Sequence, residues 1–477
     1  MFASRLTKRI GPKPERIILQ YFNLGNEERI KNVIRRVISL PEQEAVHQLE
    51  KVMRDFSFRH LNFRHKLLEN FKQIEKYVQE NISNDKKLLI GAYFSKEYSI
   101  EAASLFNPSI VAHPDQRFLK PGMLRFVMSL RATGEGHLSS LEFRSGVIDE
   151  NCEIYFDETS HFCELPAVNE DKMIDKGMLA KAVPPKDESE KNIYGRIPQL
   201  FTLHQIKEIF RAAQGSVKDE STNLFIEKIL NYAEANYEIS FNESTTVSER
   251  VIFPYSKNET VGMEDARFVK FTEDDGSITY YATYTAYNGR TFGTQLIETK
   301  DFLTFNIRTL HGNAVQDKGM ALFPRKVNGK YVISSRQGGE NLQIMYSDDL
   351  YHWDEYQQHR IPAEPWEFIQ LGNCGSPVET KDGWLLITHA VGAFRKYSMG
   401  AVLLDLDDPS KVIGRLKNPL LEPLENEREG YVPNVVYSCG SLVHNDELIV
   451  PYAMSDSYSG FAKISLPGLL AELTEKK

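Results

Sequence analysis

The stretch from Gly262 to Phe271 holds the residue types best suited to chemistry, because two adjacent carboxylates, Glu264 and Asp265, precede Arg267 at the start of an alternating apolar run. In a β-strand neighbouring side chains point to opposite faces, so Glu264 and Asp265 are not expected to serve the same pocket. Asp265 and Arg267, two residues apart, are expected to share a face. One carboxylate can then face a site while the other contacts the backbone or a partner strand. The alternative interpretation is a solvated Asp–Arg ion pair where a strand begins.

The elements that must position these residues repeat along the chain. From Val251 onward, a strand, a tight turn and an apolar strand recur about every fifty residues, a length typical of propeller blades. The turns are Asp275-Gly276, Asn328-Gly329, Asp382-Gly383 and Asn445-Asp446. With the Phe106–Ile148 region these units make five, which predicts an all-β, five-bladed β-propeller. An all-β sandwich would not explain the repeat length.

Polar residues open the first strand of each expected blade. These residues are Asn107, Asp265 with Arg267, Lys318, Asn373 with Ser376, and Asn434. A propeller places its ligand site at one end of the central channel, where the innermost strands present polar groups. We therefore expect these side chains to converge on one site.

The rest of the chain is expected to be mainly helical. Apolar residues at helical spacing predict helices over 27–40, 41–56 and about 60–81, and the pattern becomes alternating from Leu88. A Lys- and Glu-rich segment with helical periodicity at 203–213 and 222–237 interrupts the strands. The predicted organisation is a mainly helical N-terminal extension (1–87) and a propeller domain (88–477) that contains a largely helical insertion (165–246).

The composition is that of a soluble globular protein, with 41% hydrophobic and 26% charged residues. A net charge of −9 argues against a nucleic-acid partner, which would require a basic face. The four cysteines show no metal-ligand spacing and are too few for a disulfide scaffold. No stretch approaches the length of a membrane span or a signal peptide. We therefore expect a cytoplasmic protein without a membrane partner or a metal.

Six motifs occur in order along the chain: Phe106–Pro108, Gly262–Arg267, Tyr284–Tyr287, Ala321–Pro324, Gly383–His389 and Pro433–Val436. Together they resemble glycoside hydrolase family 130, which contains β-mannoside phosphorylases and related β-mannosidases. The similarity covers roughly residues 88–477, and the N-terminal helices and the insertion resemble a long-chain subgroup. The resemblance implies a five-bladed propeller, in agreement with the repeat count.

The resemblance also implies roles for individual residues. Asp265 matches the family's general acid, in a motif whose usual proline is Ala266 here. Such an acid must be protonated near neutral pH, which burial favours and a close Arg267 opposes. Arg131 matches a sugar-contacting arginine, and Asp456 an aspartate that binds mannose hydroxyls. The full set of expected substrate-binding residues is Asn107, Arg131, Arg267, Tyr284, Tyr287, Asn434 and Asp456.

The attacking group is either phosphate or water. Phosphorylases gather phosphate with cations, and the expected phosphate-binding residues are Lys318, Arg336 and His389. Gln370, where the family carries a lysine, removes one full charge. A hydrolase would need a carboxylate to activate water opposite Asp265, and the candidates near strand ends are Glu340, Glu379, Glu427 and Glu429. We favour inverting phosphorolysis of a β-mannoside to mannose 1-phosphate over hydrolysis.

Two further functions stay open: a mannosyltransferase that uses the same site on a sugar 1-phosphate, and a non-catalytic sugar-binding propeller. Asp265 argues against a pure binder, which has no use for a buried acid. No cofactor is expected, and inorganic phosphate would be the co-substrate of a phosphorylase. The expected partner is an oligosaccharide or disaccharide substrate, and homo-oligomer formation is left open.

Overall fold

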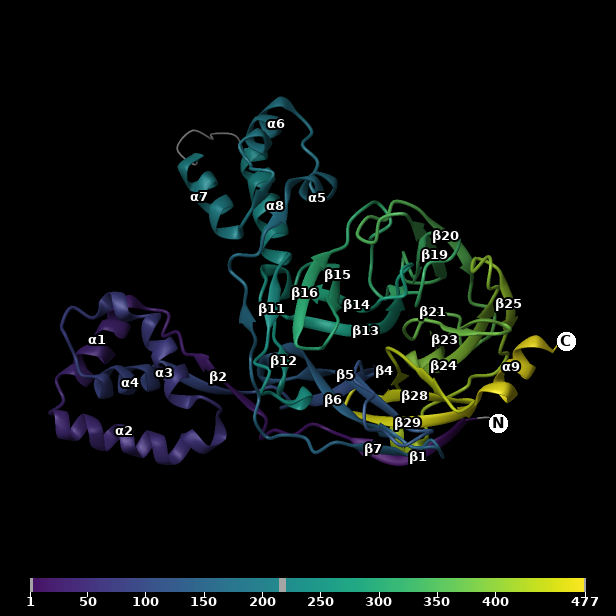
Figure 1. The fold of residues 1–477 in the computed structure, drawn as a ribbon, viewed down its shortest axis with the longest axis horizontal. Helices are drawn as coiled ribbons and strands as arrows, with labels where there is room; N and C mark the ends of the chain where they lie inside the picture. Colours follow the sequence, from purple (N-terminus) through teal and green to yellow (C-terminus); the bar gives the residue numbers. More distant parts are fainter. Residues whose placement is uncertain (1–2, 214–219, 476–477) are drawn as a thin grey trace.

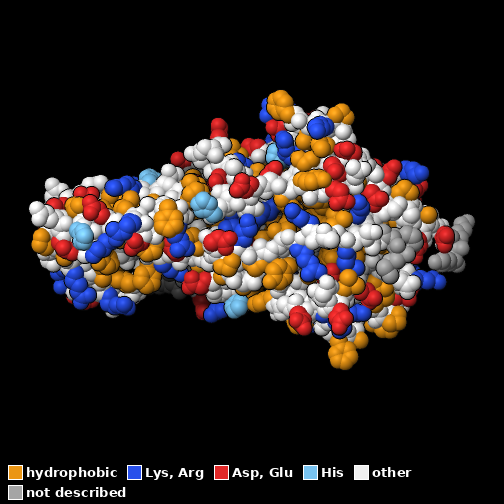
Figure 2. Space-filling view, turned by 90° about the horizontal axis from the view of Figure 1, so that it is seen from below, with side chains coloured by type: hydrophobic (Ala, Val, Ile, Leu, Met, Phe, Trp, Pro, Cys, Tyr) orange, Lys and Arg blue, Asp and Glu red, His pale blue; other side chains and the backbone are white. Residues whose placement is uncertain are grey.

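The computed structural model describes residues 3–213 and 220–475, which form several β-sheets and two separate groups of helices (Figure 1). Strands dominate the second half of the chain, and their buried faces carry the larger apolar clusters. Charged side chains of both signs are interspersed over the face seen in Figure 2, without an extended field of one sign. In the described part of the chain, no helix is long and apolar enough to cross a membrane.

The N-terminal residues contribute strands as well as helices. β1 (Ala3–Ile10) pairs antiparallel with β29 (Tyr458–Ser465), and β2 (Ile17–Tyr21) pairs with β3 (Ser95–Ser99). Between β2 and β3 the chain forms α1 (Glu27–Ile38), α2 (Glu42–Phe56), α3 (Phe63–Lys72) and α4 (Asn84–Tyr93), which project to one side of the sheets in Figure 1. The sequence pattern thus locates α1 and α2 but misses β1, which belongs to the last sheet of the chain.

Two helix boundaries in this region differ from the prediction. The helix expected over about 60–81 ends at Lys72, and Leu88 lies inside α4 instead of starting an alternating region. Ser83 caps α4, because its side chain accepts a hydrogen bond from the backbone N–H of Lys86. Leu88, Leu89 and Ile90 are all buried, so no one-sided apolar stripe marks α4 as a helix.

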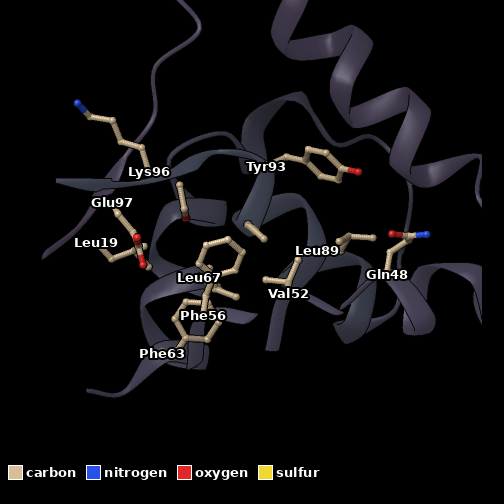
Figure 3. A pocket seen from close by; sticks show the side chains of 12 residues that line it. Leu19, Gln48, Val52, Phe56, Phe63, Leu67, Leu89, Tyr93, Lys96 and Glu97 are labelled. Atoms are coloured by element: carbon tan, nitrogen blue, oxygen red, sulfur yellow. The ribbon is translucent and has the colours of Figure 1, made fainter. Parts of the chain in front are cut away.

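An apolar pocket of about 240 Å³ lies between these helices and the β2–β3 ladder (Figure 3). Its wall includes Val52, Phe56, Phe63, Leu67 and Leu89. Every lining residue comes from the range 19–97, so the pocket is separate from the residues expected to do chemistry.

The main strands form four large sheets. The first contains, in order, β4 (Ser104–Ala112), β5 (Leu124–Thr133), β6 (Ser139–Ile148), β13 (Gly262–Thr272), β14 (Ile278–Tyr287), β15 (Phe292–Thr299) and β16 (Thr304–Thr309). Two short strands, β7 (Ile154–Phe156) and β12 (Val251–Ile252), also pair with β6. The sheet continues beyond β16 with β11 (Glu238–Ser240) and β8 (Ala167–Val168). The second contains β17 (Ala321–Leu322), β18 (Tyr331–Ser335), β19 (Leu342–Ser347) and β20 (Tyr356–Arg360). A single ladder pair, Gly262 with Ser139, joins β13 to β6, so the first sheet consists of two nearly independent parts.

The last two sheets complete the set. One contains β21 (Gln370–Asn373), β22 (Val378–Thr380), β23 (Gly383–Val391), β24 (Tyr397–Leu404) and β25 (Val412–Arg415). The other contains β26 (Val436–Tyr437), β27 (Leu442–His444), β28 (Glu447–Met454), β29 and β1, and α9 (Leu466–Thr474) follows it. In Figure 1 the sheets surround a common centre, as in a propeller.

A cavity of about 310 Å³ lies at this centre. Its walls come from β4, β13, β22, β27 and the residues that follow β17, and they include Ile110, Phe268, Pro324, Val378 and Leu442. The positions expected to be polar, such as Asn107 and Asp265, lie three residues before Ile110 and Phe268 on β4 and β13, toward the start of each strand. The expected site residues therefore gather at one end of the central axis, and this cavity lies toward the other.

The insertion after β7 forms its own apolar cluster. It contains β9 (Ile174–Asp175), α5 (Lys176–Ala182), α6 (Glu188–Gly195), β10 (Leu200–Phe201), α7 (Leu203–Ala213) and α8 (Glu220–Ala235). Phe201, Phe210, Phe225 and Ile229 are buried together within it. The helical periodicity at 203–213 and 222–237 is confirmed by α7 and α8, while β8 and β11 connect the insertion to the outer edge of β16.

Candidate active site

Glu264 and Asp265 serve the same arginine, contrary to the strand-alternation prediction. Asp265 has a left-handed backbone (φ 56°), and the β13–β14 register shifts between Glu264 and Arg267. This irregularity breaks the alternation of side chains along the strand. Arg131 Nη2 lies 2.8 Å from Glu264 Oε1, and Arg131 Nη1 lies 3.5 Å from Asp265 Oδ1. Both carboxylates therefore face one site.

Left-handed backbone conformation is common to four of the expected site residues. Asn107, Asp265, Asn434 and Asp456 have φ angles of 50°, 56°, 62° and 51°. This region is sparsely populated by residues with a Cβ, and Asn and Asp tolerate it best. Asn107 lies in a register shift of β4 that matches the one in β13, and its Nδ2 donates to Asp265 Oδ1 at 2.6 Å. Irregular backbone thus turns these side chains toward the site.

The charges around Asp265 keep its carboxyl group ionised. Enclosure of the group alone would raise its pKa. The positive charges of Arg131, Arg267 and Lys318 outweigh that effect, and the hydrogen bond from Asn107 adds to theirs, so the pKa of Asp265 lies below its ordinary value. In the ligand-free protein Asp265 is therefore a carboxylate at neutral pH.

Asp456 belongs to the same charged group and behaves in the opposite way. Burial, reinforced by the negative charge of Asp265, raises the pKa of Asp456 to about 7, although Arg131 and Arg395 act against this shift. Near neutral pH the site thus holds an ionised Asp265 and a partly protonated Asp456.

Lys318 lies on the other side of Glu264. Its Nζ is 3.5 Å from Glu264 Oε2, and its side chain is 43% exposed. Glu264 is therefore shared between Arg131 and Lys318, and this places Lys318 within the electrostatic reach of Asp265.

Arg336, His389 and Gln370 form a second cluster. His389 Nδ1 lies 2.9 Å from the carbonyl oxygen of Asn373, so Nδ1 carries the hydrogen and Nε2 is an acceptor. Arg336 Nη1 and Gln370 Nε2 reach Nε2 at 3.3 and 3.2 Å. Burial and the charges of Arg336 and Arg267 hold the pKa of His389 well below its ordinary value. His389 is therefore neutral.

Arg336 is a buried cation without a carboxylate partner. Only 9% of its surface is exposed, and its Nε has no hydrogen-bond partner among the described residues. It forms no ion pair within the described parts of the chain, and its contact with His389 is to a neutral ring. A buried guanidinium in this state is prepared to receive an anion.

Arg267 connects the two clusters through a residue that the sequence analysis did not single out. Arg267 Nη1 donates to the backbone oxygen of Asp265 at 3.0 Å, and Nη2 donates to the Tyr437 hydroxyl. The Tyr437 ring meets the His389 ring edge-on, with centroids 4.8 Å apart. The sequence signal that could have identified Tyr437 is its position, three residues after Asn434 on a short inner strand, β26.

Three residues expected to contact the sugar, Tyr284, Tyr287 and Asn434, form no side-chain hydrogen bond with Asp265 or Arg131 among the described residues. Tyr284 is buried in the apolar core of the first sheet, where its hydroxyl donates to Glu259, so it is not part of the site. Tyr287 is partly buried at the end of β14, opposite Gly262. Asn434 accepts from Arg428 Nε at 2.7 Å, and its backbone oxygen accepts from Tyr397, whose ring stacks on His389.

The four candidate water-activating carboxylates are engaged elsewhere or exposed. Glu379 forms a bidentate pair with Arg325, and Glu427 is buried between Arg5 and the Tyr452 hydroxyl. Glu340 and Glu429 are exposed. Within residues 3–213 and 220–475, no three His, Cys, Asp or Glu side chains are grouped so as to hold a metal ion.

Comparison with known proteins decides the family. The model of glycoside hydrolase family 130, described as "beta-1,4-mannooligosaccharide phosphorylase", matches residues 217–475, more than half of the chain. The chain belongs to glycoside hydrolase family 130. The matched range includes Asp265, Lys318, Arg336, His389, Asn434 and Asp456, whereas Asn107 and Arg131 precede it.

Several proteins similar to this chain carry the names of mannoside phosphorylases. The 1,2-β-oligomannan phosphorylase of Thermoanaerobacter sp. (strain X514) is 38% identical over 50% of this chain and 78% of its own length. The β-1,2-mannobiose phosphorylase of Listeria innocua is 31% identical over 46% of this chain and 63% of its own length. The solved structure of a Listeria innocua β-1,2-mannobiose phosphorylase with β-1,2-mannobiose has a TM-score of 0.47 and 21% identity, and covers 79% of this chain and 93% of that chain.

Proposed function

We propose that this family 130 enzyme is an inverting β-mannoside phosphorylase, which uses inorganic phosphate to cleave a β-mannosidic bond and releases mannose 1-phosphate. The observation that carries the proposal is Arg336: a buried guanidinium without a carboxylate, beside a neutral histidine. The relatives named above, which act on β-mannosides with phosphate, support the same reading.

The two clusters divide the reaction between them. Asn107, Arg131 and Asp456 bind the mannose unit around Asp265, which is the general acid. Lys318 and Arg336 bind phosphate, and His389 orients Arg336 because its Nε2 accepts from Arg336 Nη1. One phosphate oxygen then attacks the anomeric carbon while the bond to the leaving sugar oxygen breaks. Asp265 supplies the proton that the leaving oxygen takes up.

Phosphate binding has a consequence for the acid. Lys318 is one of the cations that hold the pKa of Asp265 low. A phosphate dianion beside Lys318 offsets that charge and thereby raises the pKa of Asp265. Asp265 then becomes protonated, and competent as an acid, only when the co-substrate is present.

Hydrolysis by the same site lacks a base. Glu379 and Glu427 already accept hydrogen bonds from arginines in ion pairs, and Glu340 and Glu429 are exposed to solvent. Activation of water on the face opposite Asp265 needs a free carboxylate there. The reverse reaction, mannosyl transfer from mannose 1-phosphate, uses the same groups.

The architecture that positions the site is a five-bladed propeller over residues 88–477, to whose last sheet β1 adds a strand. Support comes from the central cavity, whose walls come from five successive units: β4, β13, the residues after β17, β22 and β27. Two hairpins at the site end, β5–β6 and β23–β24, also share one loop geometry: Gly134 (φ −100°, ψ −159°) and Gly392 (φ −109°, ψ −162°) each precede a single 3-10 turn. Residues 1–87 are an N-terminal extension, and 165–246 an insertion.

The proposal is tested by incubating the purified protein with β-1,2- and β-1,4-linked mannobiose and mannooligosaccharides, with and without inorganic phosphate. Cleavage that requires phosphate supports it. Equal cleavage without phosphate makes the protein a hydrolase, and the absence of cleavage in both conditions argues for a binding protein.

A further inference from the structure

Arg267 is a buried arginine whose hydrogen-bond donors are not all used. It is 3% exposed, and it forms no ion pair with a carboxylate in the described parts of the chain. Nη1 is used by the Asp265 carbonyl oxygen and Nη2 by the Tyr437 hydroxyl, while the buried Nε has no hydrogen-bond partner there. A buried donor without a partner is costly, so the Arg267 guanidinium is suited to a further hydrogen-bond acceptor.

Two further donors near Arg267 are unused, while Asn107 Oδ1, beside Asp265, is a buried acceptor without a partner among the described residues. Arg336 Nε is likewise buried without a partner, and Tyr437, which accepts from Arg267, keeps its own hydroxyl hydrogen for donation. The acceptor nearby, His389 Nε2, already receives Arg336 and Gln370. A sugar hydroxyl both donates and accepts, whereas a phosphate dianion offers mainly acceptors, so this set suits phosphate better than sugar.

Gly319, which follows Lys318 in the chain, lies beside the Arg267 guanidinium. A Cβ atom at Gly319 would be 3.8 Å from Arg267 Nη2, in ordinary van der Waals contact. Gly319 has a φ of 88°, and its carbonyl oxygen accepts from Asn373 Nδ2 at 2.7 Å, which fixes this loop. The backbone oxygen of Asn373 accepts a hydrogen bond from His389 Nδ1. Asn373 therefore links the Lys318–Gly319 loop, which lies beside Arg267, to His389.

We propose that Arg267, oriented by the Tyr437 hydroxyl, is a ligand of the phosphate co-substrate and not of the sugar, and that Tyr437 is its positioning residue. The inference rests on the proposed phosphorylase function. It replaces the sugar-binding role expected for Arg267 from the sequence. It also supplies a second buried guanidinium in a cluster where position 370 is an uncharged glutamine.

The test compares KM for phosphate with KM for the mannoside in the full-length protein. For Arg267→Lys we expect KM for phosphate to rise about 10- to 100-fold, and for Tyr437→Phe about 3- to 10-fold, with KM for the mannoside changed less than 3-fold. The matched controls are Arg250→Lys and Tyr452→Phe. Arg250 is a buried arginine that donates to Thr245 and to backbone oxygens, and Tyr452 is a buried tyrosine that donates to Glu427. Both controls should keep the wild-type KM for phosphate.

Each outcome decides the inference. A rise in KM for the mannoside with an unchanged KM for phosphate would show that Arg267 binds the sugar, and this overturns the inference. An equal rise in KM for phosphate in the two control variants also overturns it. If Arg267→Lys does not fold, calorimetric titration of inorganic phosphate into Tyr437→Phe and Tyr452→Phe decides: weaker binding by Tyr437→Phe alone supports the inference, and equal binding overturns it. Cleavage by the wild type without phosphate is a separate result, which refutes the proposed function itself.

Discussion

At the scale of single residues, the chemistry depends on how one arginine is shared. Arg131 contacts Glu264, Asp265 and the Ser139 hydroxyl, and its charge also acts on Asp456. Because the guanidinium remains charged at all relevant pH values, it holds Asp265 ionised until a second anion arrives. Near neutral pH Asp265 is therefore ionised, whereas Asp456 is partly protonated.

The substitution Asp265→Asn keeps the shape of the side chain but removes the proton donor. We expect turnover of an unactivated β-mannoside to fall by a factor on the order of 10² to 10⁴, the usual contribution of a placed general acid. A mannoside with an activated leaving group hardly needs protonation, so its turnover should fall much less. Steady-state kinetics on the two substrates measures the difference, and equal losses on both would argue against an acid role.

Glu264→Gln is the companion variant. A strand with regular alternation predicts an effect on stability alone, but Glu264 contacts both Arg131 and Lys318. Loss of its charge frees both cations, so we expect a higher KM for the mannoside, with kcat less affected than in Asp265→Asn. A variant whose melting temperature falls while both kinetic constants stay unchanged would contradict this expectation.

Asp456 gives the protein a pH dependence of stability. Its folded-state pKa of about 7 lies above the ordinary value near 4, so the folded state holds a proton that the unfolded state loses between these pH values. The free energy of unfolding therefore falls as the pH rises from 4 to 7, and the cost is complete above pH 7. Asp456→Asn removes this cost. The variant should gain about 2–4 kcal/mol on the wild type at pH 8, and the gain should vanish at pH 4. Urea unfolding at both pH values checks this, and a pH-independent difference would contradict it.

At the scale of elements, the sequence pattern identified regular strands and turns but not the irregularities that build the site. The hairpin turns at Asn328-Gly329 and Asn445-Asp446 were predictable, because paired positive φ angles favour these residues, and the structure has positive φ at all four. The strands that follow them, β18 and β28, are confirmed. The bulges at Asn107 and Asp265 were not predictable, because a register shift depends on the partner strand and leaves no period in the sequence.

The remaining errors have similar causes. The buried residues of α4 are four consecutive ones, Leu88 to Gly91, which form no one-sided stripe, and the pairing of β1 with β29 joins residues more than 400 positions apart. Tyr284 carries a family motif, yet β14 directs it into the core toward the buried Glu259. Long-range pairing and side-chain direction are set by tertiary packing, which short sequence patterns do not encode.

The helical part of the N-terminal extension can be tested as a separate element. Tyr21 and Ser95 face each other in the β2–β3 ladder, so a short Asn-Gly turn can replace residues 22–94. This variant keeps β1 and Arg16, and we expect it to fold and to keep kcat within a few-fold of wild type. Removal of residues 1–94 instead deletes β1 and Arg16, and leaves the fully buried Glu101 and Glu142 with Arg144 alone. That truncation should be insoluble, because unpaired buried charge is strongly destabilising.

Circular dichroism, thermal melting and turnover of the two variants decide between the alternatives. Loss of folding in both would show that the helices are part of the propeller's core structure. Normal stability of the 1–94 truncation would show that neither β1 nor the Arg16 cluster matters for folding.

At the scale of the whole molecule, the sheets surround one axis and bring residues from distant parts of the chain to one end of it. Asn107, Asp265, His389 and Asp456 come from four different sheets or half-sheets and lie within one electrostatic neighbourhood. The expectation that polar residues at the same phase of successive blades converge agrees with this placement for Asn107 and Asp265. The direction of Arg267 toward Tyr437 and His389 emerges only when three sheets are assembled.

The central claim is phosphorolysis with inversion, and the identity of the product tests it most directly. Incubation with a β-mannobiose and inorganic phosphate should release a sugar phosphate and free sugar in equal amounts, followed by ³¹P and ¹H nuclear magnetic resonance. Direct attack by phosphate on a β-linked anomeric carbon inverts it, so the account predicts α-mannose 1-phosphate as the first product. Free mannose without an equal amount of sugar phosphate, or the β-anomer of the phosphate, would contradict it.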